Sequence, residues 1–271
     1  MIKSLLTHPL TRGMDIDSPE TTAIRRQIIQ DKPFLKKLYK DWYKSIAITL
    51  PSTELEPILE LGTGAGFLKQ YIPSLITSDL FRVEGVDVLL DGRNLPFRKA
   101  SLQGIVMINV LHHIPDTRAF FKETARCVQP RGIVAMIEPW VTPWSRLVFT
   151  MFHDEPFQPE SMNWDITDAG LLSSANGALP WIIFHRDRGQ FEHEFPEWSI
   201  IDILPITPFL YMVSGGVSMR NLMPGWTFEL LHMIENSFTP WMTSIAMFAR
   251  IVLMRNASTT NNSNPINGPA F

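Results

Sequence analysis

The sequence has only one cysteine among its 271 residues, Cys127. A lone cysteine excludes a disulfide within the chain, and with it the class of small secreted proteins that depend on disulfides for their stability. Cys127 lies in a helical pattern of apolar residues, which indicates a buried thiol rather than a reactive one. We therefore expect a protein of the reducing cytoplasm.

Long basic runs are also missing, and the formal net charge is -3. Proteins that bind nucleic acids normally show clustered Lys and Arg, because those side chains neutralise phosphates. We therefore expect no nucleic-acid partner. A small molecule, a glycan or a lipid-like compound is the more plausible substrate class.

No apolar run reaches the ~20 residues that a bilayer-spanning helix needs. The two longest apolar stretches, 200–215 and 241–254, are interrupted by Pro205, Pro208 and Arg250. The first ten residues are too short an apolar piece for a signal peptide. We expect neither export nor a transmembrane segment, and leave open a peripheral contact with lipid.

The N-terminal fifty residues predict a helical cap. Ser18 followed by Pro19 has the form of a helix start, and a second helical pattern follows Pro33. From residue 57 short apolar runs alternate with helical patterns, which is typical of a parallel sheet covered on both faces. The sequence thus predicts an α/β fold with two helices placed before the first strand.

The later part of the chain is less regular. We expect an insertion at about 140–197 that forms an acceptor pocket, followed by two strands near 198–204 and 244–253 that flank a helix. The main domain is expected to span 51–255 and to include this insertion. The tail 256–271 has no core-forming pattern and is expected to be disordered.

The most informative stretch is "ELGTGAGF", in which Gly62, Gly64 and Gly66 follow an apolar run. When a strand ends in such a turn and a helix follows, backbone N–H groups are exposed and no Cβ obstructs a ligand. A dinucleotide fingerprint requires G-x-G-x-x-G, but Phe67 occupies its third glycine position. No G-K-S or G-K-T follows, so a P-loop is excluded as well.

This turn resembles the first motif of the class I S-adenosylmethionine-dependent methyltransferases, and more specifically those of methyltransferase type 11. The similarity continues through "LITSD", "LLDGRNLPF", "IVMINVLHHIPD" and "RCVQPRGIVAMIEP". It implies a Rossmann-like, doubly wound sheet of seven strands, mostly parallel, with the last strand antiparallel. It also implies S-adenosylmethionine as the cofactor.

The resemblance further implies a role for particular residues. Glu60 would accept a hydrogen bond from the ammonium of the cofactor, Asp79 would bind the ribose hydroxyls, and Asp91 would bind the adenine amino group. The full set of expected cofactor-binding residues is Glu60, Gly62, Thr63, Gly64, Gly66, Asp79, Asp91, Gly92 and Asn109. Asn109 departs from the Ser or Asp that is more frequent at its position.

Methyl transfer to a hydroxyl requires a base in addition to alignment of the reacting atoms. His112 and His113 follow the predicted fourth strand, and His153 follows a helix after the fifth. These three histidines are the catalytic candidates, although a packing and loop-capping role is favoured over catalysis for His112 and His113. No convincing set of further ligands accompanies the segment 153–155, so no metal site is expected.

The sequence therefore predicts an S-adenosylmethionine-dependent methyltransferase that acts on a small-molecule, glycan or lipid-linked acceptor, with transfer to oxygen. Two alternatives remain open at this stage. A non-catalytic cofactor-binding scaffold would retain Asp79 and Asp91 without needing the histidines. A nicotinamide-dependent oxidoreductase would have a similar α/β fold, but the spacing of the glycines disfavours it.

Overall fold

In the computed structural model, the residues described are 6–15, 17–51, 57–153, 155–166, 170 and 174–257. They form one seven-stranded sheet of order β3-β2-β1-β4-β5-β7-β6. Its strands are β1 (Ile58–Leu61), β2 (Leu75–Asp79), β3 (Val88–Leu89), β4 (Leu102–Ile108), β5 (Val128–Pro139), β6 (Trp198–Ile206) and β7 (Phe248–Arg255).

The sheet is parallel except for β7, as the sequence predicts. Strands β2, β1, β4 and β5 pair in parallel, whereas β7 is antiparallel to both of its neighbours, β5 and β6. The strand order reverses between β1 and β4, so the carboxyl ends of these two strands border a crevice. In open α/β sheets this reversal is where ligands bind.

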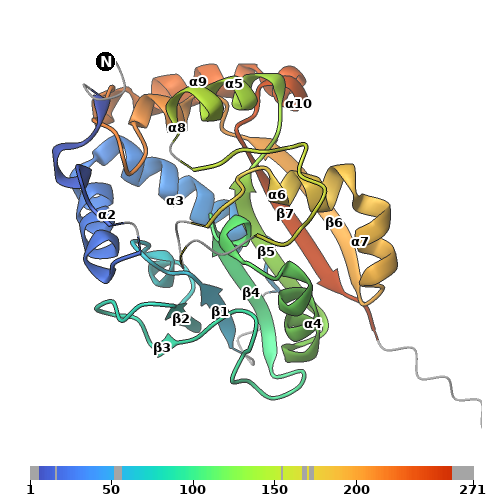
Figure 1. Cartoon of the computed structure of the whole chain (residues 1–271). Helices are drawn as coiled ribbons and strands as arrows, with labels where there is room; N and C mark the ends of the chain where they lie inside the picture. Colours follow the sequence, from blue (N-terminus) through green and yellow to red (C-terminus); the bar gives the residue numbers. More distant parts are fainter. Residues whose placement is uncertain are drawn as a thin grey trace, which may run out of the picture.

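Helices cover both faces of the sheet (Figure 1). The longer ones are α2 (Pro19–Asp31), α3 (Pro33–Ala47), α4 (Thr117–Cys127), α5 (Pro143–Phe152), α7 (Arg188–Glu194) and α9 (Phe228–Ser237). The shorter ones are η1 (Pro9–Thr11), η2 (Leu68–Gln70), η3 (Leu111–His113), α6 (Leu179–Trp181), η4 (Ile182–Arg186), α8 (Leu210–Ser214), η5 (Gly225–Thr227), η6 (Thr239–Trp241) and α10 (Met242–Ile245).

Alternate strand residues belong to two separate hydrophobic cores, because side chains along a strand point to opposite faces. On β4, Ile105 and Met107 pack with α4, η4 and α7, while Val106 packs with α3 and α5. The strands are thus apolar on both sides, which explains the uninterrupted apolar runs of the sequence.

The expected helix after the glycine turn is replaced by a single short turn. Only the 3-10 helix η2 follows, and the chain then reaches Pro73 and enters β2. Proline disfavours helical geometry at the residue before it, so the helical pattern cannot continue past Ile72. Helix α3 supplies much of the missing cover, since Tyr43 packs edge-on against Phe67 with ring centroids 4.8 Å apart.

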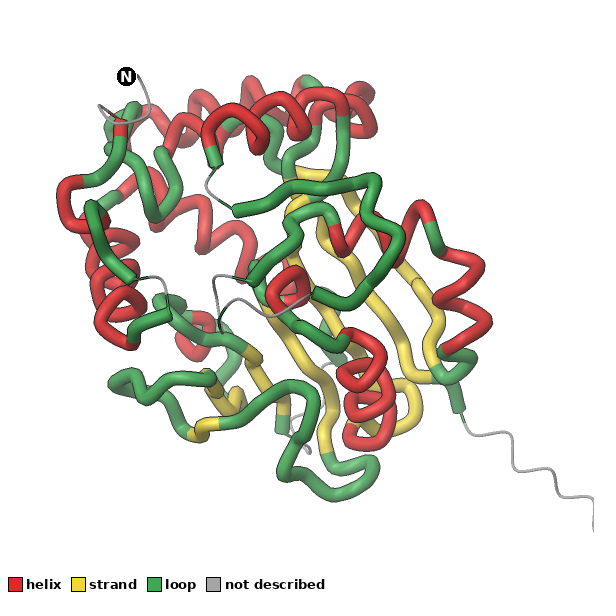
Figure 2. The backbone as a smooth tube through the Cα atoms, viewed as in Figure 1, coloured by secondary structure: helices red, strands yellow, loops and turns green. Residues whose placement is uncertain are grey.

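The segment between β5 and β6 contains α5, α6, η4 and α7, separated by long loops (Figure 2). Most of the tail 256–271 lies outside the described residues. Among the helices that the structure describes, none has both the length and the apolar character required to cross a membrane.

Candidate active site

A cavity of about 250 Å³ lies at the carboxyl ends of β1, β2 and β4. All the residues expected to bind the cofactor line it, as do all three catalytic candidates. Its wall includes Glu60, Gly62, Thr63, Gly64, Gly66, Asp79, Asp91, Gly92, Asn109, His112, His113 and His153. The tertiary structure therefore brings the predicted site residues to one place.

The glycine turn and the end of β2 are joined by Asp79. Its Oδ2 accepts the backbone N–H of Gly64 at 2.8 Å, and its Oδ1 accepts the N–H of Phe81 at 3.0 Å. Gly64 has a positive φ of 47°, a conformation that glycine adopts at little cost. Asp79 therefore orders the turn, and its carboxylate also borders the cavity.

Glu60 ends β1 beneath the turn and is 5% exposed. Burial raises the pKa of Glu60 to about 7, while the hydrogen bond from the hydroxyl of Thr63 opposes this effect. That hydroxyl lies 2.8 Å from Oε2 of Glu60. A buried carboxylate of this kind is stabilised in its charged form by a cation in the cavity.

Asp91 and Asn109 border the cavity on either side of β1. Asp91 is paired with Arg93 at 2.7 Å, and this pairing is the main reason its pKa is lowered. Asn109 has a positive φ of 56°, which Asn tolerates better than most residues. Within the described part of the chain, its Oδ1 is buried and has no hydrogen-bond partner. A ligand in the cavity is a natural partner for that atom.

The N-terminal helices α2 and α3 form part of the cavity wall, and no sequence motif pointed to their residues. Arg26 on α2 donates from Nη2 to the carbonyl of Gly64 at 2.9 Å. The hydroxyl of Tyr43 on α3 accepts the backbone N–H of Phe67 at 3.1 Å. Thr22, Arg25 and Tyr39 line the same cavity. The two helices thus hold the glycine turn in place from outside the sheet.

The histidine pair lies in η3, immediately after β4. Nδ1 of His112 is 2.6 Å from Oε2 of Glu138, and both side chains are almost fully buried. The other oxygen of Glu138 accepts the N–H groups of Val110 and Leu111, each at 2.8 Å. Glu138, which ends β5 next to Pro139, therefore orients His112 and its loop.

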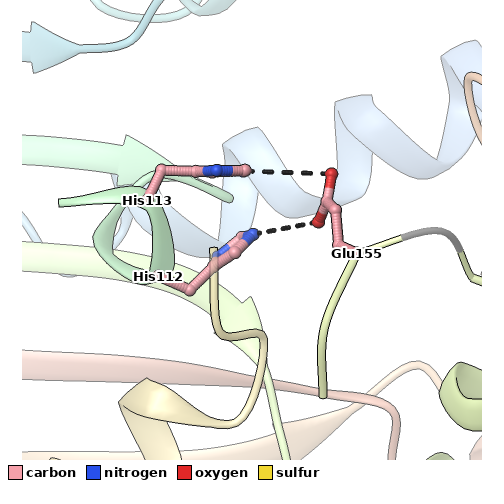
Figure 3. A group of neighbouring side chains, drawn as sticks. All are labelled: His112, His113 and Glu155. Carbon is pink, nitrogen blue, oxygen red and sulfur yellow. Dashed lines mark ion pairs between the residues drawn. The ribbon is translucent and has the colours of Figure 1, made fainter. Parts of the chain in front are cut away.

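A second carboxylate, that of Glu155, lies between the histidines (Figure 3). Its Oε2 is 3.5 Å from Nε2 of His112, and its Oε1 is 4.0 Å from Nε2 of His113. Nδ1 of His153 is 3.8 Å from Oε2. In the sequence, Glu155 stands two residues after His153, and no local pattern places it beside His112 and His113. The contact with His112 and His113 depends on how the loop after α5 folds back over η3.

The charges of this cluster are strongly coupled. Burial opposes protonation of His112, but the carboxylates of Glu138 and Glu155 outweigh it and raise the pKa of His112 to about 9. Burial and the nearby charge of His112 lower the pKa of His113 to about 4. Burial raises the pKa of Glu155, but the three histidines around it hold that pKa well below its usual range. His112 and Glu155 thus form an ion pair at neutral pH.

Two other acidic residues near the predicted site do not belong to it as described. Asp87 accepts hydrogen bonds from Lys69 at 2.6 Å and from the N–H of Thr77 at 2.9 Å, and it does not line the cavity. Asp154 lies outside the described residues. Asp79 and Asp91 therefore remain the strand-end carboxylates of the site.

Comparisons with known proteins agree with this architecture. Residues 59–136 match a family model described as a methyltransferase domain. The structure is similar to a putative methyltransferase, solved as a complex with the Haloferax volcanii Trm112 methyltransferase activator. The TM-score is 0.50 at 11% identity, covering 88% of this chain and 98% of that one. No curated protein matches the sequence.

Two further solved structures are less similar. A geranyl diphosphate C-methyltransferase from Streptomyces coelicolor has a TM-score of 0.49 at 12% identity, with 93% of this chain and 92% of that chain covered. A SAM-dependent methyltransferase from Aquifex aeolicus has a TM-score of 0.42 at 11% identity, with 79% and 89% covered.

The sheet order, the antiparallel β7 and the glycine turn after β1 define the class I methyltransferase fold. Residues 59–136 carry a methyltransferase domain. The cofactor is S-adenosylmethionine. This identification favours a methyl-transferring enzyme over the oxidoreductase and the scaffold that the sequence left open.

Proposed function

We propose that this enzyme transfers the methyl group of S-adenosylmethionine to an oxygen atom of a small, largely apolar acceptor. The observation that carries the proposal is the continuity of the cavity. Its wall runs from Gly62, Asp79 and Asp91 at one end to His113, His153 and Glu155 at the other. Donor and acceptor would therefore share one cavity, as an in-line displacement requires.

The first end of the cavity suits the cofactor. Asp79 would bind the ribose hydroxyls and Asp91 the adenine amino group, while Glu60 and the buried Oδ1 of Asn109 would accept hydrogen bonds from the ammonium. Gly62 and Gly64 keep the approach free of side chains. The raised pKa of Glu60 supports this assignment. It shows that too little positive charge lies near the carboxylate to offset its burial, and the ammonium of the cofactor would supply that charge.

The other end suits an apolar acceptor with a polar group. Phe149, Phe157, Tyr211 and Phe248 line it, together with the histidines and Glu155. Aromatic walls favour a flat or hydrocarbon-rich molecule, and the polar cluster favours a hydroxyl at its reactive end. A glycan would leave these walls unmatched, since its hydroxyls would need hydrogen-bond partners all around.

His153 is the residue we propose as proton acceptor. Its side chain is 30% exposed, against 2% for His112 and 15% for His113. His112 is tied to Glu138, so its role is to position the loop. In the reaction the acceptor oxygen forms a bond to the methyl carbon, the bond from carbon to sulfur breaks, the sulfonium becomes a thioether, and the hydroxyl proton passes to His153.

A lipid-like acceptor is a second candidate because apolar side chains are exposed near this end of the sheet. Leu147 and Met151 on α5 are 52% and 58% exposed, and Leu230 and Met233 on α9 are 53% and 65% exposed. Cosedimentation with vesicles of neutral and anionic phospholipid tests this version. Retention in the supernatant at all lipid concentrations would favour a freely soluble acceptor.

An acceptor screen with methyl-labelled cofactor tests the proposal directly. We expect label in a hydroxylated apolar compound with wild-type protein, and none with Asp79→Ala. The labelled product, analysed by NMR, reports whether oxygen, nitrogen or carbon carries the methyl group. His153→Ala should lower kcat at least about 100-fold while cofactor affinity is kept. Unchanged turnover in that variant would remove His153 from the role of base.

A further inference from the structure

His112, His113 and Glu155 direct three ligating atoms at one point of the cavity wall (Figure 3). One ring nitrogen from each histidine and one carboxylate oxygen of Glu155 all lie within 4.8 Å of one another. The rings of His112 and His113 are adjacent, with centroids 4.2 Å apart. Both histidines belong to the short 3-10 helix η3, whose tight backbone turn lets two consecutive side chains face the same carboxylate.

The spacing is that of ligands around a metal ion. Ligand atoms about 2.0 to 2.2 Å from one ion are separated from each other by roughly 3.3 to 4.2 Å, depending on the angle between them. Nε2 of His112 is 3.5 Å from Oε2 of Glu155, and Nε2 of His113 is 4.0 Å from Oε1. Binding of one ion would require the three side chains to bring one atom each into this range.

The surroundings of His112 provide an independent observation. Histidines that bind metals almost always donate their other ring N–H to a carboxylate, which fixes the tautomer and directs the free nitrogen at the ion. Glu138 occupies that place at 2.6 Å from Nδ1 and is itself held by the N–H groups of Val110 and Leu111. Nε2 of His112 is therefore the atom that faces Glu155 and the cavity, and an ion bound there would take the place of its proton.

We propose that His112, His113 and Glu155 form a binding site for a divalent transition-metal ion of the zinc class. Two imidazoles and one carboxylate are a ligand set that zinc and non-haem iron accept, whereas magnesium prefers oxygen ligands alone. The motif reasoning did not anticipate this site, because its carboxylate comes from a different loop than its histidines.

Such an ion would have open positions toward the cavity. An acceptor oxygen bound there would lie at the end of the pocket where the histidines and Glu155 meet, and the ion's charge would favour loss of the hydroxyl proton. This part of the inference rests on the proposed function. The binding of the ion by itself does not, because the ligands are all provided by the chain.

The test uses tag-free, full-length protein that has been treated with a chelator and returned to buffer. Isothermal titration with zinc chloride should give one site per chain. Titration with cobalt(II) should produce the visible absorption of a low-coordinate site. His113→Ala and Glu155→Gln should each weaken zinc binding at least about 100-fold, and Glu138→Gln about 10 to 100-fold. His193→Ala, which alters an exposed histidine on α7, should have no effect.

Circular dichroism and binding of S-adenosylhomocysteine check that each variant is folded. The inference is overturned if zinc binds wild type, His113→Ala and Glu155→Gln alike, if wild type binds no zinc, or if only magnesium binds. Zinc binding without any S-adenosylhomocysteine binding would instead count against the proposed function and leave the metal site standing. The two ideas therefore fail through different measurements.

Discussion

Nδ1 of His112 lies 2.6 Å from Oε2 of Glu138, and the two side chains are 2% and 0% exposed. Glu138 belongs to β5, and His112 to the loop after the neighbouring strand β4. The second oxygen of Glu138 accepts the N–H groups of Val110 and Leu111 in that same loop. One buried carboxylate thus fixes the segment that presents both histidines to the cavity.

Replacement of Glu138 should therefore destabilise the whole domain. Glu138→Ala leaves the His112 ring and two backbone N–H groups without partners in the core, which should lower the free energy of unfolding by about 3 to 5 kcal/mol. Urea unfolding followed by circular dichroism measures this change. The matched control is Glu192→Ala, which breaks an exposed pair with Arg188 and should cost under about 0.5 kcal/mol. Similar losses in the two variants would contradict a structural role for Glu138.

Asp79 should be needed for cofactor affinity. Asp79→Ala removes the acceptor proposed for the ribose hydroxyls, so binding of S-adenosylhomocysteine should weaken by about 1.5 to 3 kcal/mol, or roughly 10 to 150-fold. Calorimetric titration gives the dissociation constants. Asp87→Asn is the control, because Asp87 does not line the cavity and should leave affinity unchanged. An Asp79→Ala variant that binds as wild type would refute the ribose assignment.

Glu60 should make ligand-free stability and cofactor binding respond oppositely to pH. The pKa of Glu60 is raised from 4.5 to about 7 by burial, so the folded state holds its proton between these values more tightly than the unfolded state does. The associated stability is full below pH 4.5 and is lost as pH rises to 7, by up to about 3 kcal/mol. Glu60→Gln should escape that loss.

Thermal unfolding of wild type and Glu60→Gln between pH 4.5 and 8 measures the effect. We expect the variant to gain stability relative to wild type as pH rises through about 7, yet to bind S-adenosylmethionine more weakly, because the charged carboxylate is absent. Wild-type affinity should increase over the same pH range. A difference between the two proteins that does not vary with pH would show that Glu60 is charged in the empty protein as well.

Gly66 should not tolerate a side chain. A Cβ at this position would lie 2.8 Å from the carbonyl oxygen of Thr63 and 2.8 Å from the hydroxyl of Tyr43. Gly66→Ala should therefore cost about 1 to 3 kcal/mol of stability and weaken cofactor binding, as the glycine turn moves away from α3.

Gly189→Ala is the matched substitution. Gly189 lies on α7 with no atom within 4 Å of an added Cβ, so alanine there should stabilise the protein by about 0.5 kcal/mol. Thermal melts and S-adenosylhomocysteine titrations of both variants separate the two cases. Normal cofactor affinity in Gly66→Ala would mean that close packing of the turn is not needed for binding.

Much of the fold could be predicted because its signals are local. Apolar runs on both faces indicate parallel strands, and the strand-end position of Asp79 follows from the short run that precedes it. The order of motifs was enough to predict the antiparallel β7 by resemblance. After Gly66 the helical pattern gives only the short 3-10 helix η2, since Pro73 follows closely, and Tyr43 of α3 packs against Phe67 beside it.

By itself, the sequence determined the class of fold, the methyl donor and the strand ends that face it, because each depends on residues close together in the chain. Only the tertiary structure decided that Glu138 orients His112, that Glu155 reaches both histidines, and that Arg26 and Tyr43 hold the glycine turn. These contacts join segments far apart in sequence. These contacts form only when helices and loops pack over the sheet, and no local sequence pattern predicts that packing.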